Sequence, residues 1–169
     1  MIAEIVNKYF SRIGPILAKT IGVTPNVYTD YLPPSFCNSA VFVHTDSNEI
    51  LQIIDSLNNT NSTGEDDVPS IILKQWAQYV ANLLSKLINN AFESGIFPTA
   101  LKSGKVVPIY KSGSKNLCEN YRPISLISNF AKIFEKAITI RLKKFLQKIN
   151  IPSKNQFGFQ KKSLPPRQY

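Results

Sequence analysis

The sequence predicts a helix-dominated α+β fold with one short pair of strands. Apolar residues recur at intervals of three and four over most of the chain, as on amphipathic helices, and only two short segments have the character of β-strands. The chain has 169 residues, of which 43% are hydrophobic. It can therefore build the core of one ordinary domain.

The first predicted helix covers the apolar residues from Ile2 to Ile13. We expect it to stop at Gly14-Pro15, because a proline disfavours helical backbone in the residue before it, and a continuation from Leu17 to Ile21 stays open. Three prolines between Val23 and Pro34 indicate that a linker follows.

A short strand from Ala40 to Val43 and a second helix are expected next. Asp46 followed by Glu49 resembles a capping box, in which each residue satisfies a backbone amide at the start of the helix. The apolar face of this helix consists of Ile50, Ile53, Ile54 and Leu57. A polar loop from Asn58 to Asp67 ends it.

The most periodic segment runs from Ile72 to Phe92 and predicts one long buried helix that closes near Gly95. Its apolar stripe consists of Trp76, Tyr79, Val80, Leu83, Leu84, Leu87, Ile88 and Ala91. Two strand candidates follow, Lys105 to Tyr110 and Pro123 to Ile127. A loop rich in Ser, Gly, Lys and Asn joins them as a hairpin-like pair.

The last predicted helix runs from about Asn129 to Ile149. Its inward residues are Phe130, Ile133, Phe134, Ala137, Ile138, Leu142, Phe145 and Leu146. Its outer face is expected to carry Lys132, Lys136, Arg141, Lys143, Lys144 and Lys148. This helix would therefore present a strongly basic surface to its surroundings.

Charge divides the chain into two unlike halves. Residues 1–100 hold 5 Lys and Arg against 9 Asp and Glu, a net −4, whereas residues 101–169 hold 15 against 2, a net +13; the sum is the +9 of the whole chain. Nucleic acid is the commonest partner of such a basic half, and an anionic membrane surface is the second. A solvated basic face without a partner is the alternative.

Several classes of site and location are excluded by the sequence. Cys37, Cys118 and the single His44 lack metal-ligand spacing, so neither a zinc site nor a disulfide framework is expected. Gly104-Lys105 lacks the other residues of a phosphate-binding Walker loop, and no serine has the surroundings of a nucleophile. No apolar run reaches membrane-spanning length or resembles a signal peptide, which favours an intracellular, reduced environment without membrane association.

Glu65, Asp66 and Asp67 form the only acidic cluster. Two-metal phosphoryl transfer needs clustered carboxylates, so a metal-dependent enzyme using these residues is one hypothesis. In a loop before Pro69, however, such residues more naturally favour the positive N-terminus of the following helix. We favour the helix-cap interpretation over the metal site.

Cations and tyrosines are interleaved around the two strand candidates. They are Lys102, Lys105, Lys111, Lys115 and Arg122, with Tyr110 and Tyr121. Cations beside aromatic rings fit nucleotide or single-strand binding, whereas tyrosines in strands are equally often packing residues. The planar guanidinium of Arg122 suits a phosphate group, and Glu119 is its alternative, structural partner.

A series of short blocks follows in a characteristic order. They are Phe97-Pro98, Leu101-Lys102, Val106 to Lys111, Asn120 to Leu126, Lys132 to Glu135, Arg141-Leu142 and Gln156 to Phe159. The ordered set resembles the reverse transcriptase domain of non-long-terminal-repeat (non-LTR) retrotransposons, the jockey-like group in particular. Upstream, Tyr9 to Gly14, the helix at Glu49-Ile50, and Ser62 to Gly64 with Asp66 and Val68-Pro69 look like the region before these blocks. The resemblance extends to about Lys162.

The chain departs from the family pattern at several positions. Leu101 stands where the family usually has Trp, Asn61 where Lys is common, and Asp67 where Gly usually follows the Asp. After Phe159 the family continues with Arg and a Gly-x-Ser-Thr segment, whereas this chain continues differently from Gln160 to Pro166.

The resemblance implies part of an RNA-directed DNA polymerase, namely its fingers and the region leading to them, without the palm sheet. Residues 1–60 would be the preceding helical region, 61–162 a partial reverse transcriptase domain, and 163–169 a divergent tail. Arg122 would contact the incoming triphosphate, with Lys111 as a second candidate. The family's catalytic carboxylates, which bind Mg²⁺, follow these blocks, so we expect no catalytic or metal-binding residue, no cofactor, and no activity by this chain alone.

Our leading interpretation is a truncated reverse transcriptase fragment that keeps a nucleic-acid-facing surface. Its expected partners are an RNA or single-stranded DNA template, and itself or a full-length polymerase; its expected location is the nucleus or the cytoplasm. The alternative is a retained RNA-binding or polymerase-interacting module without an enzymatic role. The candidate nucleic-acid contacts are Lys102, Lys105, Lys115, Lys132, Lys136, Arg141, Lys143, Lys144 and Lys148.

Overall fold

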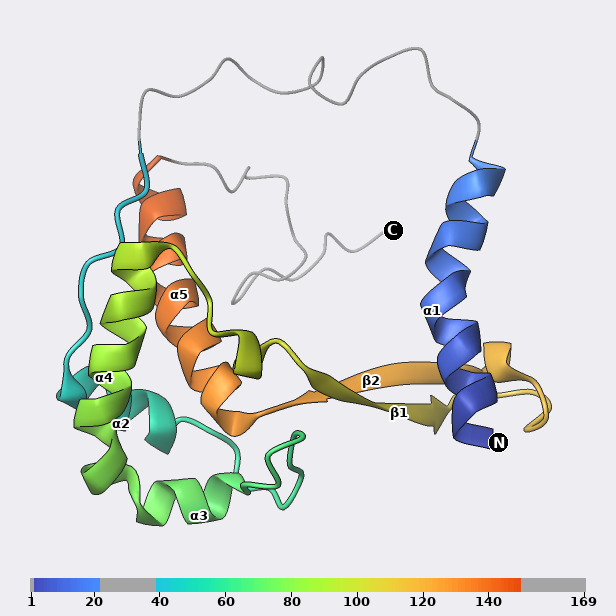
Figure 1. Cartoon of the computed structure of the whole chain (residues 1–169), viewed down its shortest axis with the longest axis horizontal. Coiled ribbons are helices and arrows are strands. Elements are labelled where there is room, and N and C mark those ends of the chain that lie inside the picture. Colours follow the sequence, from blue (N-terminus) through green and yellow to red (C-terminus); the bar gives the residue numbers. More distant parts are fainter. Residues whose placement is uncertain (1, 22–38, 150–169) are drawn as a thin grey trace, which may run out of the picture.

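The computed structural model describes residues 2–21 and 39–149, and these residues form the mixed, helix-dominated structure that the sequence predicts. The elements are α1 (Ile2–Thr20), α2 (Ser47–Asp55), α3 (Ser70–Gln75), α4 (Ala77–Ser94), β1 (Gly104–Tyr110), β2 (Tyr121–Ile127) and α5 (Asn129–Lys148), with short 3₁₀ turns at Thr99–Leu101 and Cys118–Asn120. Helices α2 to α5 form one group, from which the two strands extend, and α1 lies across the far part of the strands (Figure 1).

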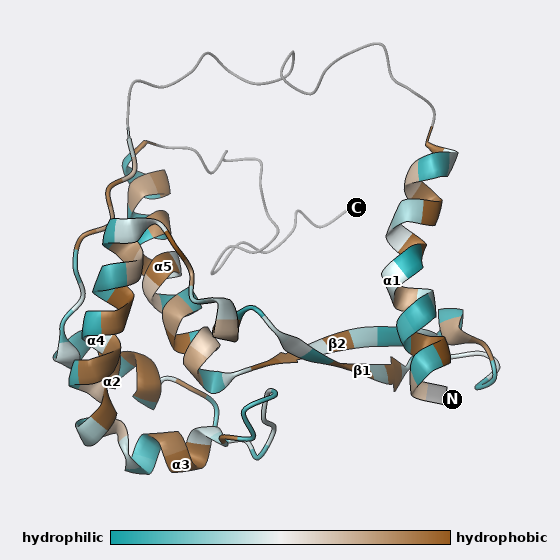
Figure 2. Ribbon diagram, viewed as in Figure 1, coloured by the Kyte–Doolittle hydropathy of each residue, from teal (hydrophilic) through white to brown (hydrophobic). Residues whose placement is uncertain are grey.

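The hydrophobic core lies between α2, α4 and α5. Its buried residues are Ile50, Ile53, Ile54, Leu57, Leu73, Ala81, Leu84, Ile88, Ile133, Phe134 and Ala137. Phe97, just after α4, packs edge-on against Phe134 with ring centroids 5.8 Å apart. Hydrophobic and hydrophilic residues alternate along each of these helices (Figure 2). The four residues predicted for the apolar face of the second helix are all in this core.

The start of α2 is capped by one half of the predicted capping box. The Asp46 carboxylate accepts a hydrogen bond of 2.7 Å from the Glu49 amide, as an N-cap residue should. The Glu49 carboxylate instead accepts hydrogen bonds from Thr45 and Arg141. Glu49 therefore connects two helices and does not contribute the second half of the box.

The predicted long helix is divided at Trp76 into α3 and α4. Both parts pack against α2, and a bend at Trp76 lets them do so. The periodicity gives no sign of this bend, because Leu73 and Leu84 would share one face of a straight helix as well. The prediction of full burial is also wrong, since Trp76, Tyr79, Leu83 and Leu87 are exposed. The C-terminus agrees with the sequence: Gly95 has φ 68° and closes α4.

Two further boundaries differ from the sequence prediction. Helix α1 continues through Gly14-Pro15 to Thr20 as one helix, although Pro15 has no amide hydrogen to donate. Residues 40–43 form no strand in the structure. The carbonyl groups of Val43 and His44 accept hydrogen bonds from the Arg141 side chain, and not from a neighbouring strand. The linker from Val23 to Pro34, Cys37 and the block from Gln156 to Phe159 lie outside the described residues.

The predicted strand pair is an antiparallel hairpin of β1 and β2. Its register pairs Gly104 with Ile127 at the core end and Tyr110 with Tyr121 at the far end. The predicted last helix is α5, which begins directly after β2 and Ser128. No helix among the described residues is both long enough and apolar enough to cross a membrane.

Candidate nucleic-acid interface

The β1–β2 hairpin has two different faces. Because side chains alternate across a strand, Val106 and Pro108 share one face with Pro123, and this face borders α1. A cavity of about 830 Å³ lies there, lined by Ala3, Val6, Asn7, Phe10, Ser11, Gly104, Val106, Pro108 and Pro123. The opposite face is the one that Lys105 and Arg122 share. We call it the open face of the hairpin.

Arg122 and Lys111 are neighbours on the open face. Ile109 pairs with Arg122 in the strand register, and the Lys111 amide donates a 2.8 Å hydrogen bond to the Asn120 carbonyl at the next position. Lys111 is therefore the diagonal neighbour of Arg122, at a typical separation of about 7–8 Å. Both side chains are exposed. Arg122 forms no ion pair with Glu119, the alternative partner considered from the sequence, or with any other described residue.

The two tyrosines at the far end brace the hairpin loop. Their rings meet edge to face at 5.6 Å between centroids, and Lys115 Nζ lies 5.6 Å from the Tyr110 ring centroid. Tyr110 donates a 2.6 Å hydrogen bond to the Gly113 carbonyl, and Tyr121 one of 2.9 Å to the Lys115 carbonyl. Of the two interpretations left open by the sequence, these contacts are those of packing residues.

The cations of α5 do not share one outer face. At about 100° per residue, Lys132, Lys136 and Lys143 fall on one stripe, whereas Lys144 and Lys148 lie about a quarter turn or more away from it. The ammonium groups of the first two are engaged within the molecule. Lys132 donates to Asn129 Oδ1 at 2.9 Å, and Lys136 donates to Ser56 Oγ at 2.8 Å. Lys143, Lys144 and Lys148 are exposed, as are Lys102 and Lys105 beside the hairpin.

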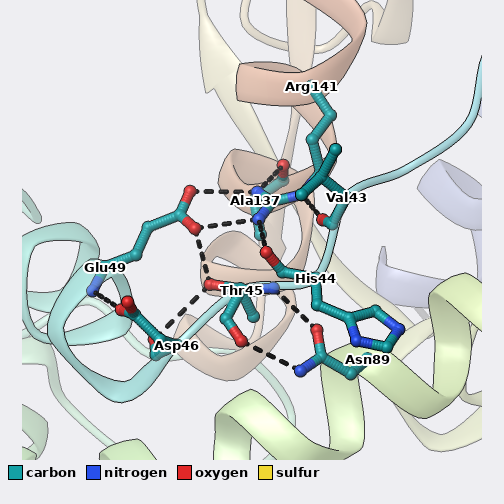
Figure 3. Close-up of polar contacts among 8 residues, drawn as sticks. All are labelled: Val43, His44, Thr45, Asp46, Glu49, Asn89, Ala137 and Arg141. Atoms are coloured by element: carbon teal, nitrogen blue, oxygen red, sulfur yellow. Dashed lines mark hydrogen bonds and ion pairs between the residues drawn. The ribbon is translucent and has the colours of Figure 1, made fainter.

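Arg141 is buried, so the prediction that it lies on the outer face of α5 is wrong. All five of its N–H groups donate hydrogen bonds: Nε to the Val43 carbonyl, Nη1 to Glu49 and the Ala137 carbonyl, and Nη2 to Glu49 and the His44 carbonyl (Figure 3). Its guanidinium group lies over the Phe92 ring at 5.0 Å from the centroid. Arg141 therefore holds the segment before α2 onto α5.

The Arg141 ion pair changes the titration of its partner. Hydrogen bonding from Arg141 lowers the pKa of the Glu49 carboxyl below its ordinary value of 4.5, and the Thr45 hydroxyl adds to this effect, while burial opposes it. Thr45 is itself tied to α4, because its amide donates to Asn89 Oδ1 at 2.8 Å and its carbonyl accepts from Asn89 Nδ2 at 2.9 Å (Figure 3). Sequence reasoning missed this network, since nothing local connects residues so far apart along the chain.

The acidic loop before α3 does not cap that helix. The N-cap of α3 is Pro69, which has no side-chain hydrogen bond, so the helix-cap prediction for Asp66 and Asp67 is wrong as stated. Asp66 Oδ2 instead accepts a 2.6 Å hydrogen bond from Ser128 Oγ, and Ser128 is the N-cap of α5. Asp67 Oδ1 accepts a hydrogen bond from Thr63.

These carboxylates do not fit a Mg²⁺ site. Asp66 and Asp67 are each engaged by a hydroxyl group, and among residues 2–21 and 39–149 no three His, Cys, Asp or Glu residues gather as metal ligands do. His44 Nε2 lies 2.8 Å from Glu93 Oε1, and Cys118 is a free thiol. We therefore assign no metal-dependent step to these residues.

The backbone conformation of Asp67 explains one departure from the sequence pattern of the resembled family. Asp67 stands where that pattern usually has Gly, and it has φ 52°, the left-handed region that glycine enters without cost. Asp is among the few other residues that adopt this conformation readily. The loop therefore keeps the backbone path that a glycine would allow.

The chain is similar over much of its length to curated transposon proteins. It is 33% identical over 112 residues, 66% of the chain, to a probable RNA-directed DNA polymerase from transposon BS of Drosophila melanogaster. It is 28% identical over 140 residues, 82% of the chain, to the RNA-directed DNA polymerase from mobile element jockey of the same species. The chain is homologous to a segment of these polymerases. The resemblance to the jockey-like, non-LTR group is thereby confirmed.

A third relative, the probable RNA-directed DNA polymerase from transposon X-element of Drosophila melanogaster, is 28% identical over 112 residues. The chain spans only 12% to 15% of the length of these polymerase relatives. No family model matches it. The homology thus covers one part of each of these larger polymerases.

Proposed function

We propose that this chain is part of the fingers of a non-LTR retrotransposon polymerase and binds the backbone of an RNA or single-stranded DNA template. The observation that supports it best is the open face of the hairpin, where Lys105, Lys111 and Arg122 are exposed in a segment similar to RNA-directed DNA polymerases. None of the three side chains has a hydrogen-bond or ion-pair partner among the described residues. Cations without a partner are free to contact phosphates.

Arg122 and Lys111 are proposed to contact a triphosphate group. The guanidinium fork can donate two parallel hydrogen bonds to phosphate oxygens, and an ammonium group nearby adds a point charge. The diagonal position of the two residues lets both reach one polyphosphate. The exposed lysines Lys102, Lys105, Lys115, Lys143, Lys144 and Lys148 would contact a longer strand.

We further propose that the chain alone does not polymerise. Polymerisation needs carboxylates that hold Mg²⁺ at the attacking and leaving oxygens, and the acidic residues of the loop before α3 are engaged elsewhere. Its contribution to a polymerase would be positioning of template and nucleotide.

The test is binding of a labelled single-stranded RNA, measured by fluorescence anisotropy over a range of salt concentrations. The hairpin variant combines Lys105→Gln, Lys111→Gln and Arg122→Gln. Its control combines Lys8→Gln, Arg12→Gln and Lys19→Gln on α1, which removes the same charge. Each lost phosphate contact should lower the slope of log K against log salt by about 0.7, so the hairpin variant should lose about two units.

The control should retain most of its slope, because α1 borders the opposite face of the hairpin. An equal loss in both variants would mean that affinity follows net charge alone, and would overturn the proposed surface. Arg122→Ala alone should weaken binding of a deoxynucleoside triphosphate more than binding of a long strand. Absence of RNA binding by the unaltered chain would overturn the proposal altogether.

A further inference from the structure

The hairpin makes its main contacts with itself, and its direction depends on how it joins the helices. Its strands pair along their full length, whereas the extensive packing among helices is confined to α2, α3, α4 and α5. One junction, at the start of β1, follows the 3₁₀ turn Thr99–Leu101. The other is Ser128, the single residue between β2 and α5. The orientation of Arg122 relative to the core is therefore set largely at these two points.

The Ser128 junction is held by the loop that precedes α3. The Ser128 hydroxyl donates to Asp66 Oδ2 at 2.6 Å and accepts from the Phe130 amide at 3.0 Å, so one side chain connects the loop to the first turn of α5. Next to it, the buried Asn129 donates from Nδ2 to the Val68 carbonyl at 2.7 Å. The two hydrogen bonds to the loop, from Ser128 and from Asn129, each join residues more than 60 positions apart.

The backbone of the same loop lies directly against the junction. A Cβ atom added at Gly64 would lie 2.4 Å from the Ser128 nitrogen and 2.7 Å from the Ile127 carbonyl carbon, which leaves no room for any side chain. Gly64 is buried, while Asp66 is exposed. The hydrogen bond between Asp66 and Ser128 therefore lies outside the hydrophobic core, at the point where the chain leaves β2.

We infer that Asp66 is a positioning residue that, through Ser128, fixes the direction of the hairpin and with it the open face that carries Arg122. Asp66 itself would touch no ligand. The binding part of this inference rests on the proposed function, whereas the direction of the hairpin can be measured without any ligand.

The first test measures the hairpin directly. Spin labels are placed through Ser112→Cys in the hairpin loop and Gln78→Cys on α4, both exposed positions, in a chain that also carries Cys37→Ser and Cys118→Ser. Asp66→Ala should broaden or shift the distance distribution between the labels. Asp67→Asn is the matched control, because it removes the same charge, tolerates the positive φ and does not contact Ser128.

An unchanged distribution in Asp66→Ala, with a thermal transition like that of the parent, would overturn the inference. If Asp66→Ala does not fold, Ser128→Ala replaces it, because it removes the hydroxyl group that donates the same hydrogen bond, and it should also broaden the distribution. Ser128→Ala with the parent distribution would equally overturn the inference. These results do not depend on whether the chain binds nucleic acid.

The second test links position to binding. Asp66→Ala should weaken RNA binding about fivefold relative to Asp67→Asn, which corresponds to about 1 kcal/mol, the size of a typical hydrogen bond. In the Asp66→Ala background, Arg122→Gln should cost less affinity than in the parent, since Arg122 is already displaced. Additive losses would mean that the Arg122 contact does not depend on Asp66, and would contradict the binding part of this inference. No loss of affinity in Arg122→Gln itself, together with an altered label distance in Asp66→Ala, would show that Asp66 orients the hairpin but that Arg122 is not a contact, and would contradict the proposed function alone.

Discussion

Arg141 on α5 and Glu49 on α2 form a two-pronged ion pair, with Nη1–Oε1 at 2.9 Å and Nη2–Oε2 at 2.8 Å. The Arg141 side chain is 8% exposed and that of Glu49 27%. The same guanidinium group also satisfies three backbone carbonyls, two of them in the segment just before α2. A residue whose charge and neighbours in sequence suggested a surface cation is therefore a structural centre of the core.

Arg141→Ala should lower the free energy of unfolding by about 3 kcal/mol, because it leaves a partly buried carboxylate and three carbonyls without their donor. Urea unfolding followed by circular dichroism measures the change. Lys143→Ala, two residues further on α5 and exposed, is the control and should alter stability by less than about 0.5 kcal/mol. Equal stability of the two variants would contradict the structural role of Arg141.

The Glu49 pair should make the chain sensitive to acid. Arg141 holds the pKa of the Glu49 carboxyl below 4.5, its ordinary value. A folded-state pKa below the unfolded one gives stability that is fully present above the unfolded pKa and is lost as the pH falls through the folded pKa. The free energy of unfolding should therefore decrease less between pH 6 and pH 3 in Glu49→Gln than in the parent. Urea unfolding at each pH measures it. Parallel curves for the two proteins would refute the prediction.

Substitution of two glycines by alanine should affect stability differently, because Gly64 lies against other backbone atoms and Gly14 has free space around it. Gly64→Ala places a Cβ against the backbone of Ser128, so the loop or the β2–α5 junction must shift, at a cost of about 1 to 3 kcal/mol. Gly14→Ala, in the middle of α1, meets no atom within 4 Å and should be neutral or stabilising, because alanine favours the helix. Thermal unfolding compares them; a neutral Gly64→Ala would show that the loop does not lie against the junction.

Local signals predicted most of the elements, and contacts between distant residues account for what they missed. The helix cap at Asp46, the helix end at Gly95 and the two short strands with their loop depend on a few adjacent residues, so their positions followed from the sequence. The bend at Trp76 and the burial of Arg141 depend on how helices pack against one another. The spacing of apolar residues along a helix does not show whether another element covers them. Lysine spacing on α5 likewise could not reveal that Lys136 reaches Ser56, 80 residues away.

The candidate site likewise has a part that local sequence signals predicted and a part that only contacts between distant residues reveal. The motif order found the family, and the two strand candidates with Lys111 and Arg122 beside them predicted the hairpin on which both residues lie. The hydrogen bond of Asp66 to Ser128 joins a residue of the upstream region to a residue between two of the blocks, and only the fold brings these two residues together. A serine immediately before a helix was the one available signal, because Ser is a favoured N-cap residue.

Helix α4 has an apolar face that no other part of residues 2–21 and 39–149 covers. Leu83 and Leu87 are 60% and 46% exposed, and with Trp76, Tyr79 and Ile96 they form a large hydrophobic patch. A groove of about 610 Å³ beside it is lined by Leu83, Leu84, Leu87, Asn90, Ala91, Ser94, Ile96, Pro98, Leu101, Phe130 and Phe134. Patches of this kind favour association with another surface.

The chain should therefore bind a hydrophobic dye and self-associate at micromolar concentration. Leu83→Gln with Leu87→Gln should reduce both properties with little change in stability, since these side chains already face water. Leu84→Gln is the matched control on the same helix: Leu84 is buried in the core, so this change should destabilise the fold by about 2 kcal/mol or more and increase dye binding. Analytical ultracentrifugation measures association, and a monomeric parent that ignores the dye would contradict the prediction.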